Sequence, residues 1–335
     1  MKKIVINGFG RIGKIAFRLL MQNKDYEVVA INSHSTPEEI AYMLKYDSIY
    51  HSFNNLLINY NDNEIIINGS VTKIYQIDDP KKYPWKELNV DLVLECTGAF
   101  TKEEAAKKHL DAGAKHVLIS APGKGNMKTI VYGVNEHTLT KEDNIVSAAS
   151  CTTNALAPIL NLIDRFIGIE SGFMTTIHSY TNDQNTLDGS HKKGIYSRRG
   201  RGAAINIIPT STGAASAIGD VIPNLKGKLD GLAYRVPTSD GSVIDLSLNL
   251  YRETTKEELN AIFEENQDEV INFTLDPIVS SDVIGNPCAS LIDGELTEVL
   301  DANKRVIKLV IWYDNEYGYT AQMIRTMAKI LSLDI

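Results

Sequence analysis

Cys151 is a candidate nucleophile in this chain of 335 residues. It lies in the segment Ser-Cys-Thr-Thr-Asn (150–154), between an apolar run over 145–149 and a helical pattern that begins near residue 155. A cysteine at a helix N-terminus lies near the positive end of the helix dipole and near free N–H donors, which lower the thiol pKa and favour the thiolate. The alternative is a buried, inert thiol. We also expect Pro158 to interrupt the helix soon after it begins.

A thiol nucleophile needs a base, and the chain has seven histidines. His178 stands apart from the others, because it ends the apolar run 174–177 and precedes the polar segment 179–184. A histidine in this position could equally be structural. His109 lies in an ordinary amphipathic stretch, so we expect a solvated surface residue there.

The segment 8–13 reads G-x-G-x-x-G, and it follows a strand pattern and opens a helical one. Glycine permits a tight turn and close backbone approach, so a pyrophosphate can lie on the free N–H groups at the helix N-terminus. The pattern predicts dinucleotide binding; the alternative is a glycine-rich turn without a ligand. Its residues are Gly8, Phe9, Gly10, Arg11, Ile12 and Gly13.

Asn32 and Ser33 end the second strand pattern, about twenty residues after the last of these glycines, where an NAD-specific site usually places Asp or Glu on the ribose 2′-hydroxyl. Without a carboxylate there, a 2′-phosphate meets no like charge. The run 33–36 offers hydroxyl donors and the imidazole of His34 instead. We favour a site that accepts NADP; the alternative is that Asn32 and backbone groups hold the ribose of NAD.

A basic stretch over 191–201 contrasts with the acidic balance of the whole chain. Clustered arginines can hold phosphate oxygens through bidentate hydrogen bonds. For most of these charges a solvated loop or a subunit contact is the simpler interpretation. Arg235 differs, because it lies within the apolar run 232–237 and needs an anionic partner or an outlet to solvent.

The elements that must position these residues predict two domains. In the first third of the chain, short apolar runs alternate with amphipathic stretches, as in a parallel sheet with helical crossovers. We expect strands over 3–7, 27–32, 91–95 and 115–120, helices over 11–23, 36–45 and 101–112, and a hairpin around residues 68–69. The fold class is therefore α/β, with a Rossmann-type doubly wound parallel sheet in the first domain.

The pattern changes beyond residue 150. Strand patterns over 172–179, 232–237, 243–251 and 306–312 follow one another mostly without helices, which indicates an α+β domain with a mixed, largely antiparallel sheet. We expect one helical crossover over 256–269 and a final helix over 320–333.

The composition excludes several classes of protein. A hydrophobic content of 43% supports a core in each domain, and a formal net charge of −8 gives no attraction for nucleic acid or for an anionic membrane. Three cysteines without C-x-x-C spacing argue against a disulfide framework or a structural zinc site, and we expect no metal. No apolar run approaches about 18 residues, and we expect a cytoplasmic protein.

Taken together, the motifs resemble phosphorylating glyceraldehyde-3-phosphate dehydrogenase over essentially the whole chain. The matching segments are 7–13 (NGFGRIG), 147–154 (SAASCTTN), 178–181 (HSYT), 209–215 (PTSTGAA), 235–238 (RVPT) and 312–316 (WYDNE). The resemblance implies a homotetramer. It also implies an NAD(P)-binding Rossmann domain over 1–150, completed by a C-terminal helix over about 317–335, and a catalytic glyceraldehyde-3-phosphate domain over 151–316.

The resemblance assigns roles to individual residues, with Cys151 as the nucleophile and His178 as its base. It implies that the substrate phosphate is bound by Thr181, Asp183, Arg201 and Arg235, and that a second anion site for inorganic phosphate is formed by Ser150, Thr152, Thr210 and Gly213. The cofactor residues implied beyond the glycine motif are Asn32, Ser33, Thr97, Gly98, Ser120, Ser190, Asn315 and Tyr319, of which Asn315 orients the nicotinamide.

The implied reaction oxidises glyceraldehyde 3-phosphate with NAD(P) and phosphate to 1,3-bisphosphoglycerate through a Cys151 thioester, in glycolysis or gluconeogenesis. The backbone N–H of Cys151 and the His178 imidazole are candidate donors to the oxyanion. Two alternatives stay open: an erythrose-4-phosphate dehydrogenase, and a nucleotide-fold binding protein with a secondary RNA or surface role. The net charge of −8 argues against broad RNA affinity.

The chain departs from the family pattern at several positions. Ser33 replaces the Asp of NAD-type members, and Gly189-Ser190 replaces the usual Gly/Leu-Pro of the basic loop, so we expect NADP to be used at least comparably to NAD. Asp78 stands where a basic residue often lies beside the adenine. Ala155 and Ser216 replace a frequent second cysteine and a lysine, and the segment 193–197 makes the basic loop longer than the common bacterial form.

Overall fold

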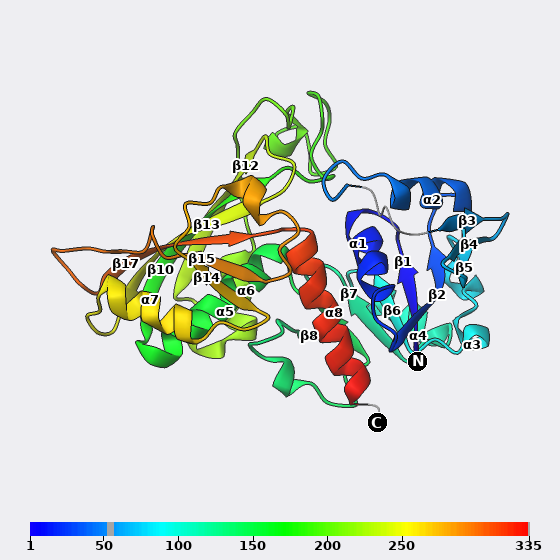
Figure 1. The fold of residues 1–335 in the computed structure, drawn as a ribbon, viewed down its shortest axis with the longest axis horizontal. Helices are drawn as coiled ribbons and strands as arrows, with labels where there is room; N and C mark the ends of the chain where they lie inside the picture. The colour runs from blue at the N-terminus through cyan, green and yellow to red at the C-terminus, as the bar shows by residue number, and fades with distance from the viewer. Residues whose placement is uncertain (52–56, 334–335) are drawn as a thin grey trace. The chain divides into compact units, whose positions relative to one another are not determined.

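The computed structural model describes residues 1–51 and 57–333, drawn as a ribbon in Figure 1. The chain divides into two compact units. The first unit comprises Met1–Ser150 and the C-terminal stretch from Thr320, and the second comprises Cys151–Tyr319. Among the described residues, no helix is long and apolar enough to span a bilayer.

The first unit contains a sheet of nine described strands in the order β3-β4-β5-β2-β1-β6-β7-β9-β8. The strands are β1 (Lys2–Asn7), β2 (Tyr26–Asn32), β3 (Ile58–Tyr60), β4 (Glu64–Ile67), β5 (Ser70–Tyr75), β6 (Leu92–Glu95), β7 (His116–Ile119), β8 (Lys128–Thr129) and β9 (Ile145–Ser147). All neighbours from β5 to β8 along this order pair in parallel, whereas β3, β4 and β5 pair antiparallel. The order β5-β2-β1-β6-β7-β9 is that of a doubly wound Rossmann sheet, which confirms the predicted fold class.

Local sequence signals explain the elements around this sheet. The helices are α1 (Arg11–Leu20), α2 (Pro37–Lys45), α3 (Trp85–Leu88) and α4 (Glu103–Asp111). Thr36 caps α2 in a capping box with Glu39, and Pro37 occupies the first turn. Asn68 and Gly69 both have positive φ, at 48° and 86°, as the two central residues of a type I′ hairpin turn require.

His109 is buried in the first unit, so the expectation of a solvated surface residue is wrong. Its side chain is fully inaccessible on α4. The indole Nε1 of Trp85 donates to His109 Nδ1 at 3.1 Å, and the ring of Tyr83 stacks on the imidazole with centroids 5.2 Å apart. These partners lie outside α4, so the amphipathic pattern of the helix could not reveal them.

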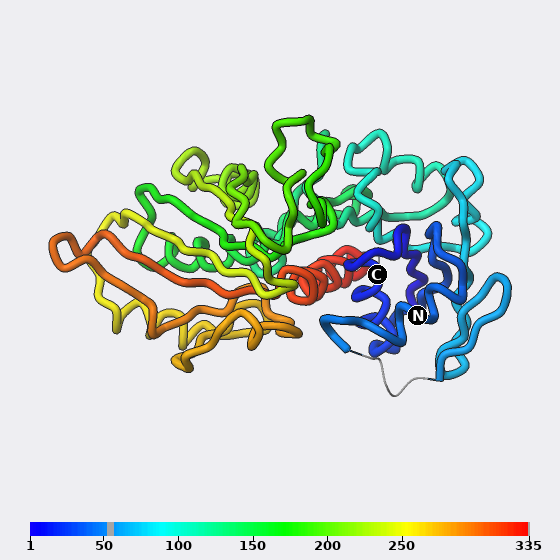
Figure 2. Tube along the Cα trace, turned by 90° about the horizontal axis from the view of Figure 1, so that it is seen from above, coloured from blue at the N-terminus to red at the C-terminus, as the bar shows by residue number. Residues whose placement is uncertain are grey.

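The second unit is built on a sheet of eight described strands, with the main order β11-β12-β10-β13-β17-β15-β14. The strands are β10 (Ile169–Ser179), β11 (Ile208–Ser211), β12 (Leu229–Val236), β13 (Ser242–Leu250), β14 (Ile271–Thr274), β15 (Ser290–Asp293), β16 (Glu298–Val299) and β17 (Val306–Tyr313). The pairs β10–β12 and β14–β15 are parallel and the others antiparallel, which confirms a mixed, largely antiparallel sheet. Figure 2 shows the long strands β13 and β17 running side by side.

The helices described in the second part of the chain are α5 (Cys151–Phe166), α6 (Ala214–Val221), α7 (Lys256–Glu265) and α8 (Tyr317–Ser332). Helix α5 packs against β10, β15 and β17, and α6 packs against β12. Side chains therefore alternate along β10: Met174, Thr176 and His178 are buried, whereas Phe173 is exposed. The sequence analysis missed α6, whose eight residues follow the glycine-containing turn that ends with Gly213.

Helix α5 continues through Pro158, so the expected interruption does not occur. A proline inside a helix removes one N–H donor and displaces the carbonyl four residues earlier. Ser290 Oγ donates to the adjacent carbonyl of Ala155 at 2.7 Å, and the Ser290 side chain is fully buried. A hydroxyl from β15 thus supplies a donor where the intrahelical ladder is weakened.

The glycine turn of the first unit gives a prediction of stability. A Cβ on Gly13 would overlap the carbonyl oxygen of Gly8, so we expect Gly13→Ala to lower the free energy of unfolding by about 1–3 kcal/mol. Thermal unfolding of the cofactor-free protein measures the change. Gly10→Ala is the matched control, because a Cβ there meets no atom within 4 Å and the φ of −80° suits alanine. Equal effects of the two substitutions would contradict the packing argument.

Candidate functional site

The second unit brings Cys151 and His178 together. Cys151 is the first residue of α5 and His178 lies near the end of β10, with 3.4 Å between Sγ and Nε2. His178 Nδ1 lies 2.8 Å from the carbonyl oxygen of Ser179. Because a carbonyl can only accept, this contact places the ring proton on Nδ1 and leaves Nε2 as an acceptor toward the thiol.

Burial determines the protonation of this pair. It lowers the pKa of the His178 imidazole to about 3, and the nearby Arg235 cation acts in the same direction. Burial also raises the pKa of the Cys151 thiol, although Arg235 and the Thr152 hydroxyl oppose the change. The backbone N–H of Thr152, in the first turn of the helix, lowers the thiol pKa as predicted, but burial outweighs it and the net shift is upward. Both shifts favour the neutral forms of the two groups.

Tyr313, the last residue of β17, supports the pair from one side and was missed by the sequence analysis. Its hydroxyl lies 3.0 Å from Thr152 Oγ1 and 2.8 Å from Thr176 Oγ1. The tyrosine ring meets the His178 ring edge to face, with centroids 5.9 Å apart. Tyr313 lies in the matched segment 312–316, but nothing in that segment indicates that its partners are on α5 and β10.

Arg235 lies beside His178 because β10 and β12 pair in parallel with these residues opposite each other. Its Nη1 donates to the carbonyl of Ser179 at 3.1 Å and to Thr181 Oγ1 at 2.9 Å. Thr181 in turn donates to Asp183 Oδ1 at 2.5 Å. The structure therefore assembles three of the four residues assigned to the substrate phosphate.

The fourth, Arg201, lies elsewhere. Its side chain is largely exposed and its Nε donates to Asp188 at 2.8 Å. Arg199, which the sequence analysis did not single out, forms an ion pair with Asp183 and is nearly buried. The two arginines are two residues apart in one basic stretch, and the sequence carries no signal to tell which of them turns toward Asp183.

The other predicted residues of the second unit lie on several elements. Asn315 is buried, and its Oδ1 accepts hydrogen bonds from Ser179 Oγ at 2.7 Å and from Ser242 Oγ at 2.6 Å. The remaining positions are Thr210 on β11, Gly213 directly before α6, Ser190 in the exposed basic loop, and buried Tyr319 in the first turn of α8.

The first unit has a cavity of about 590 Å³ at the carboxyl ends of its central strands. Its lining includes Gly8, Phe9, Gly10, Asn32, Ser33 and Thr97 from the predicted cofactor residues. Gly10 precedes α1 without a side-chain cap, so the first N–H groups of that helix are not used by a capping side chain. This combination fits a dinucleotide with its pyrophosphate near the start of α1.

Other predicted cofactor residues lie close to this lining. Gly98 lies between the lining residues Thr97 and Ala99, and Ser120 follows β7. Ile12 and Gly13 belong to the first turn of α1, as does Arg11, whose Nη1 donates to Asp47 at 2.6 Å.

Asp47 forms ion pairs with Arg11 and Lys14 at the start of α1. Although burial favours the neutral carboxyl, hydrogen bonds from Arg11 and Lys14 hold the pKa of Asp47 well below its usual value. The Arg11 guanidinium is therefore already committed to a carboxylate of the same unit.

The rim of the cavity carries the groups that bear on cofactor choice. Ser33 Oγ accepts from the backbone N–H of Ser35 at 3.3 Å. His34 Nδ1 lies 3.6 Å from Asp78 Oδ1, and both side chains are exposed. Ser33, His34 and Asp78 all line the same cavity, so this rim has hydroxyls, an imidazole and one solvated carboxylate.

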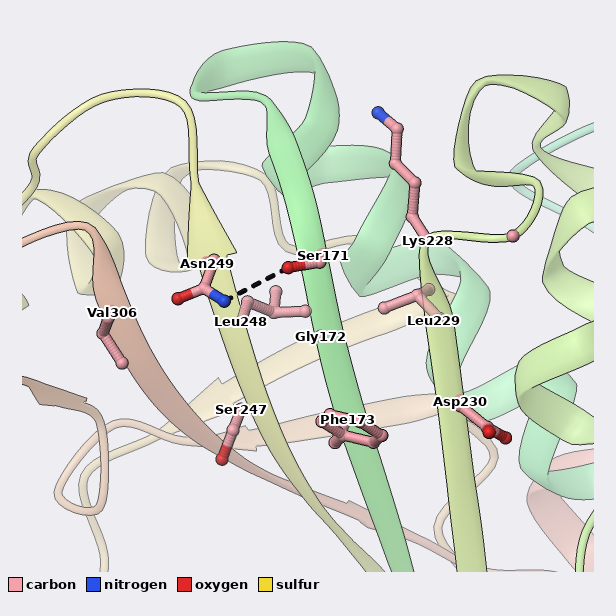
Figure 3. A pocket seen from close by; sticks show the side chains of 11 residues that line it. Ser171, Gly172, Phe173, Lys228, Leu229, Asp230, Ser247, Leu248, Asn249 and Val306 are labelled. Atoms are coloured by element: carbon pink, nitrogen blue, oxygen red, sulfur yellow. Dashed lines mark hydrogen bonds between the residues drawn. The ribbon is translucent and has the colours of Figure 1, made fainter.

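A second cavity, of about 300 Å³, lies among β10, β12 and β13 (Figure 3). Figure 3 shows the hydrogen bond from Asn249 Nδ2 to Ser171 Oγ, 3.1 Å long, beside Leu248 and Gly172. Its lining contains none of the residues predicted to be catalytic or to bind ligands. We therefore assign no chemistry to it.

The doubly wound sheet with its glycine turn and cavity defines a Rossmann-type nucleotide-binding protein. Comparison with known families agrees and goes further. The model described as glyceraldehyde 3-phosphate dehydrogenase, NAD binding domain, matches residues 2–103, and the one described as glyceraldehyde 3-phosphate dehydrogenase, C-terminal domain, matches residues 150–315. The chain belongs to the glyceraldehyde-3-phosphate dehydrogenase family.

Individual relatives support the same family. The chain is 50% identical over 329 residues to the glyceraldehyde-3-phosphate dehydrogenase of Clostridium acetobutylicum, and 50% identical over 328 residues to that of Clostridium pasteurianum, with 98% of each chain covered in both comparisons. It is 48% identical over 337 residues to that of Lactobacillus delbrueckii subsp. bulgaricus, with 99% of each chain covered.

The buried imidazole predicts how stability depends on pH. The pKa of His178 is about 3 in the folded protein and 6.5 for an ordinary histidine, so the unfolded chain binds the extra proton between these values. Acidification below pH 6.5 therefore costs wild-type stability through this group, on the order of 1 kcal/mol per pH unit. We expect His178→Asn to lose less stability than wild type between pH 6.5 and about 4.5 in thermal unfolding.

His34→Asn is the matched control for this measurement, because His34 is almost fully exposed. It should follow the wild-type pH dependence. A His178→Asn protein that loses as much stability as wild type would show that His178 does not resist protonation in the folded state.

Proposed function

We propose that this protein oxidises glyceraldehyde 3-phosphate with NAD(P) and inorganic phosphate to 1,3-bisphosphoglycerate, through a thioester on Cys151, in glycolysis or gluconeogenesis. The family supports an NAD-dependent oxidoreductase that acts on an aldehyde. The observation that carries the proposal is the 3.4 Å contact between the Cys151 thiol and the unprotonated Nε2 of His178, with Arg235 opposite His178 on the next strand.

The first steps follow from the neutral resting pair. His178 Nε2 takes the thiol proton as Cys151 Sγ attacks the aldehyde carbon, and the imidazolium returns that proton to the developing oxyanion, giving a thiohemiacetal. His178 then takes the hydroxyl proton as hydride leaves the carbon. The nicotinamide cofactor, when bound, supplies the hydride acceptor. Phosphate attacks the resulting thioester, which releases the acyl phosphate and restores the cysteine.

A low pKa alone makes His178 a weak base, so proton transfer depends on the thiolate that forms beside it. A base that is neutral at pH 7 is ready to accept a proton, and the conjugate imidazolium is stabilised as soon as a thiolate forms 3.4 Å away. The bond from Nδ1 to the Ser179 carbonyl keeps the ring oriented through both transfers. General-base catalysis of this kind contributes about 10²–10⁴-fold.

Arg235 and Thr181 are suited to bind the substrate phosphate. Arg235 is partly buried, and its partners Ser179 O and Thr181 Oγ1 are neutral, so its charge is not neutralised by either of them. A phosphate oxygen would supply the opposite charge and would accept strong charge-assisted hydrogen bonds from Arg235. Asp183, paired with Arg199, orients Thr181. We propose Ser150, Thr152, Thr210 and Gly213 as the site of the attacking inorganic phosphate.

We propose that NADP is used at least comparably to NAD. Ser33, directly after β2, stands in place of a carboxylate and lines the cofactor cavity. Asp78 contributes the carboxylate at this rim, but it is exposed and lies beside His34, so solvent screens its charge. Ser190, on a neighbouring subunit, adds room and a hydroxyl.

The assembly and domain roles are also proposals. We propose a cytoplasmic homotetramer in which residues 1–150, with the C-terminal helix over about 317–335, bind the cofactor and residues 151–316 carry the catalytic groups. Exposed apolar side chains support association; they lie on the second sheet (Phe173 and Leu232), in the basic stretch (Ile195 and Tyr196) and on either side of that stretch (Leu187 and Ile205).

Replacing the nucleophile tests the reaction. We expect Cys151→Ser to retain cofactor binding and to lose all but a few per cent of turnover, because a serine hydroxyl forms no appreciable oxyanion at pH 7. Steady-state oxidation of glyceraldehyde 3-phosphate and of erythrose 4-phosphate by the wild type identifies the substrate. Cys288→Ser, which alters a buried thiol, should keep its turnover. Retained activity in Cys151→Ser would exclude the thioester route.

Replacing Ser33 tests the cofactor proposal. Two like charges within about 4–6 Å cost on the order of 1–4 kcal/mol, so Ser33→Asp should lower kcat/KM for NADP about tenfold or more and change the value for NAD far less. Ser33→Ala removes the hydroxyl without adding charge and separates repulsion from a lost hydrogen bond. A wild-type preference for NAD of about a hundredfold, or an unchanged NADP value in Ser33→Asp, would contradict this role of Ser33.

A further inference from the structure

A chain of buried amides crosses the carboxyl edge of the first sheet. Asn32, Asn7 and Glu95 end the neighbouring strands β2, β1 and β6, and all three are buried. Asn32 Nδ2 donates to Asn7 Oδ1 at 2.8 Å, and Asn7 Nδ2 donates to Glu95 Oε2 at 2.5 Å. At the other end, the backbone N–H of Ile77 donates to Asn32 Oδ1 at 2.9 Å. Asn7, Asn32 and Ile77 all line the cofactor cavity.

Glu95 also holds the loop that follows β6. The backbone N–H of Thr97 donates to Glu95 Oε1 at 2.8 Å, and the Thr97 hydroxyl donates to the same oxygen. Thr97 Oγ1 then accepts from the backbone N–H of Ala99 at 3.0 Å. Because Thr97 and Ala99 line the cavity, the side chain of Glu95 fixes both of these wall residues.

His109 supplies a further contact to Glu95, and Trp85 fixes its direction. An indole N–H can only donate, so the 3.1 Å contact from Trp85 Nε1 makes His109 Nδ1 an acceptor. The ring proton is then on Nε2, which donates to Glu95 Oε2 at 3.1 Å. If Nδ1 of His109 also carried a proton, that N–H would face the indole N–H of Trp85, and neither could accept.

Apart from the bond that Asn32 Nδ2 donates to the Ile77 carbonyl at 3.0 Å, the hydrogen bonds described above are donated toward Glu95. Four donors converge on its two oxygens, from Asn7, Thr97 N, Thr97 Oγ1 and His109, which matches the acceptor sites of a carboxylate. In a buried setting such chains of bonds polarise one another. Glu95 is thus the acceptor on which the network ends.

The two loops held by this network touch without intervening side chains. Gly8 has a φ of +95°, and a Cβ there would overlap the backbone of Cys96 and Thr97. The backbone N–H of Cys96 donates to the carbonyl of Asn7 at 2.7 Å. A shift of Thr97 would therefore displace the glycine turn as well.

We propose that Glu95, oriented by His109 and Trp85, is a positioning residue for the dinucleotide: it fixes the loops after β1 and β6 that line the cofactor cavity. The inference rests on the proposed use of a dinucleotide. His109 also contacts two residues that line the cavity. The rings of Tyr83 and Phe100 pack against the His109 imidazole, with centroids 5.2 and 5.1 Å away.

Glu95→Gln tests this role with little change in shape. In wild type, Thr97 donates to one oxygen of Glu95, and Asn7 and His109 donate to the other. The glutamine amide replaces one of these oxygens by an NH₂ group, which cannot accept a hydrogen bond. In either orientation, one set of donors therefore loses its acceptor. We expect the dissociation constant for NAD, measured by titration calorimetry, to rise about tenfold or more. The KM for NAD should rise with it, while kcat at saturating cofactor changes less than about threefold.

Hydrogen exchange in the cofactor-free protein provides a second readout. The amides of Thr97 and Ala99 should exchange faster in Glu95→Gln than in wild type. Trp85→Phe keeps an aromatic ring and removes the indole donor, so we expect a smaller change in the same direction, about threefold in the dissociation constant. This variant also keeps the proposal testable where Glu95→Gln does not fold.

Thr72→Val is the matched control. Thr72 is buried in the same sheet, and its hydroxyl donates to the Val28 carbonyl at 2.9 Å without lining the cavity. It should lower thermal stability and leave NAD binding and loop exchange unchanged. An equal loss of NAD binding in Thr72→Val would overturn this inference and leave the proposed function standing. Wild-type NAD binding and wild-type amide exchange in both Glu95→Gln and Trp85→Phe would do the same. Wild-type protein that binds neither NAD nor NADP would overturn the proposed function and this inference together.

Discussion

The hydrogen bond between His178 Nδ1 and the carbonyl of Ser179 is the contact on which the second unit's site depends. It fixes the tautomer that turns an acceptor toward Cys151, and the same carbonyl accepts from Arg235. The Ser179 hydroxyl donates to Asn315 Oδ1, and the backbone N–H of Ser179 donates to Ser242 Oγ. One residue at the end of a strand therefore orients a base and a cation through its carbonyl oxygen and an amide through its hydroxyl.

The first unit also gathers several hydrogen-bond donors on one acceptor, which there is a side chain and not a backbone carbonyl. There a buried carboxylate, Glu95, collects donors from neighbouring strand ends, whereas in the second unit a backbone carbonyl does so. Rearranging such a buried acceptor is costly, because buried donors such as the Asn7 amide and the His109 ring would lose their partner. Each site is stiff because its polar atoms have few alternatives.

Local signals in the sequence were sufficient for the doubly wound sheet, the capped helix and the placement of Cys151 at a helix start. They failed wherever a distant partner decides the outcome. His109 is buried because Trp85, 24 residues earlier, supplies a donor to its ring. Helix α5 tolerates Pro158 while Ser290, 135 residues beyond Ala155, donates to that carbonyl. Arg199 replaces its neighbour beside Asp183 through loop geometry that no periodicity encodes.

The parallel pairing of β10 with β12 has a consequence for how this family can diverge. His178 and Arg235 face each other because the ladder between these strands is in register, with eight consecutive pairs from Gly172–Leu229 to Ser179–Val236. Of the chain between the two strands, β11 pairs with β12 and places Ile208 opposite Arg235, whereas the basic loop lies outside the ladder. Insertions in the basic loop, outside β11, therefore leave the base opposite the cation, whereas one residue added within either strand would turn their side chains to opposite faces of the sheet.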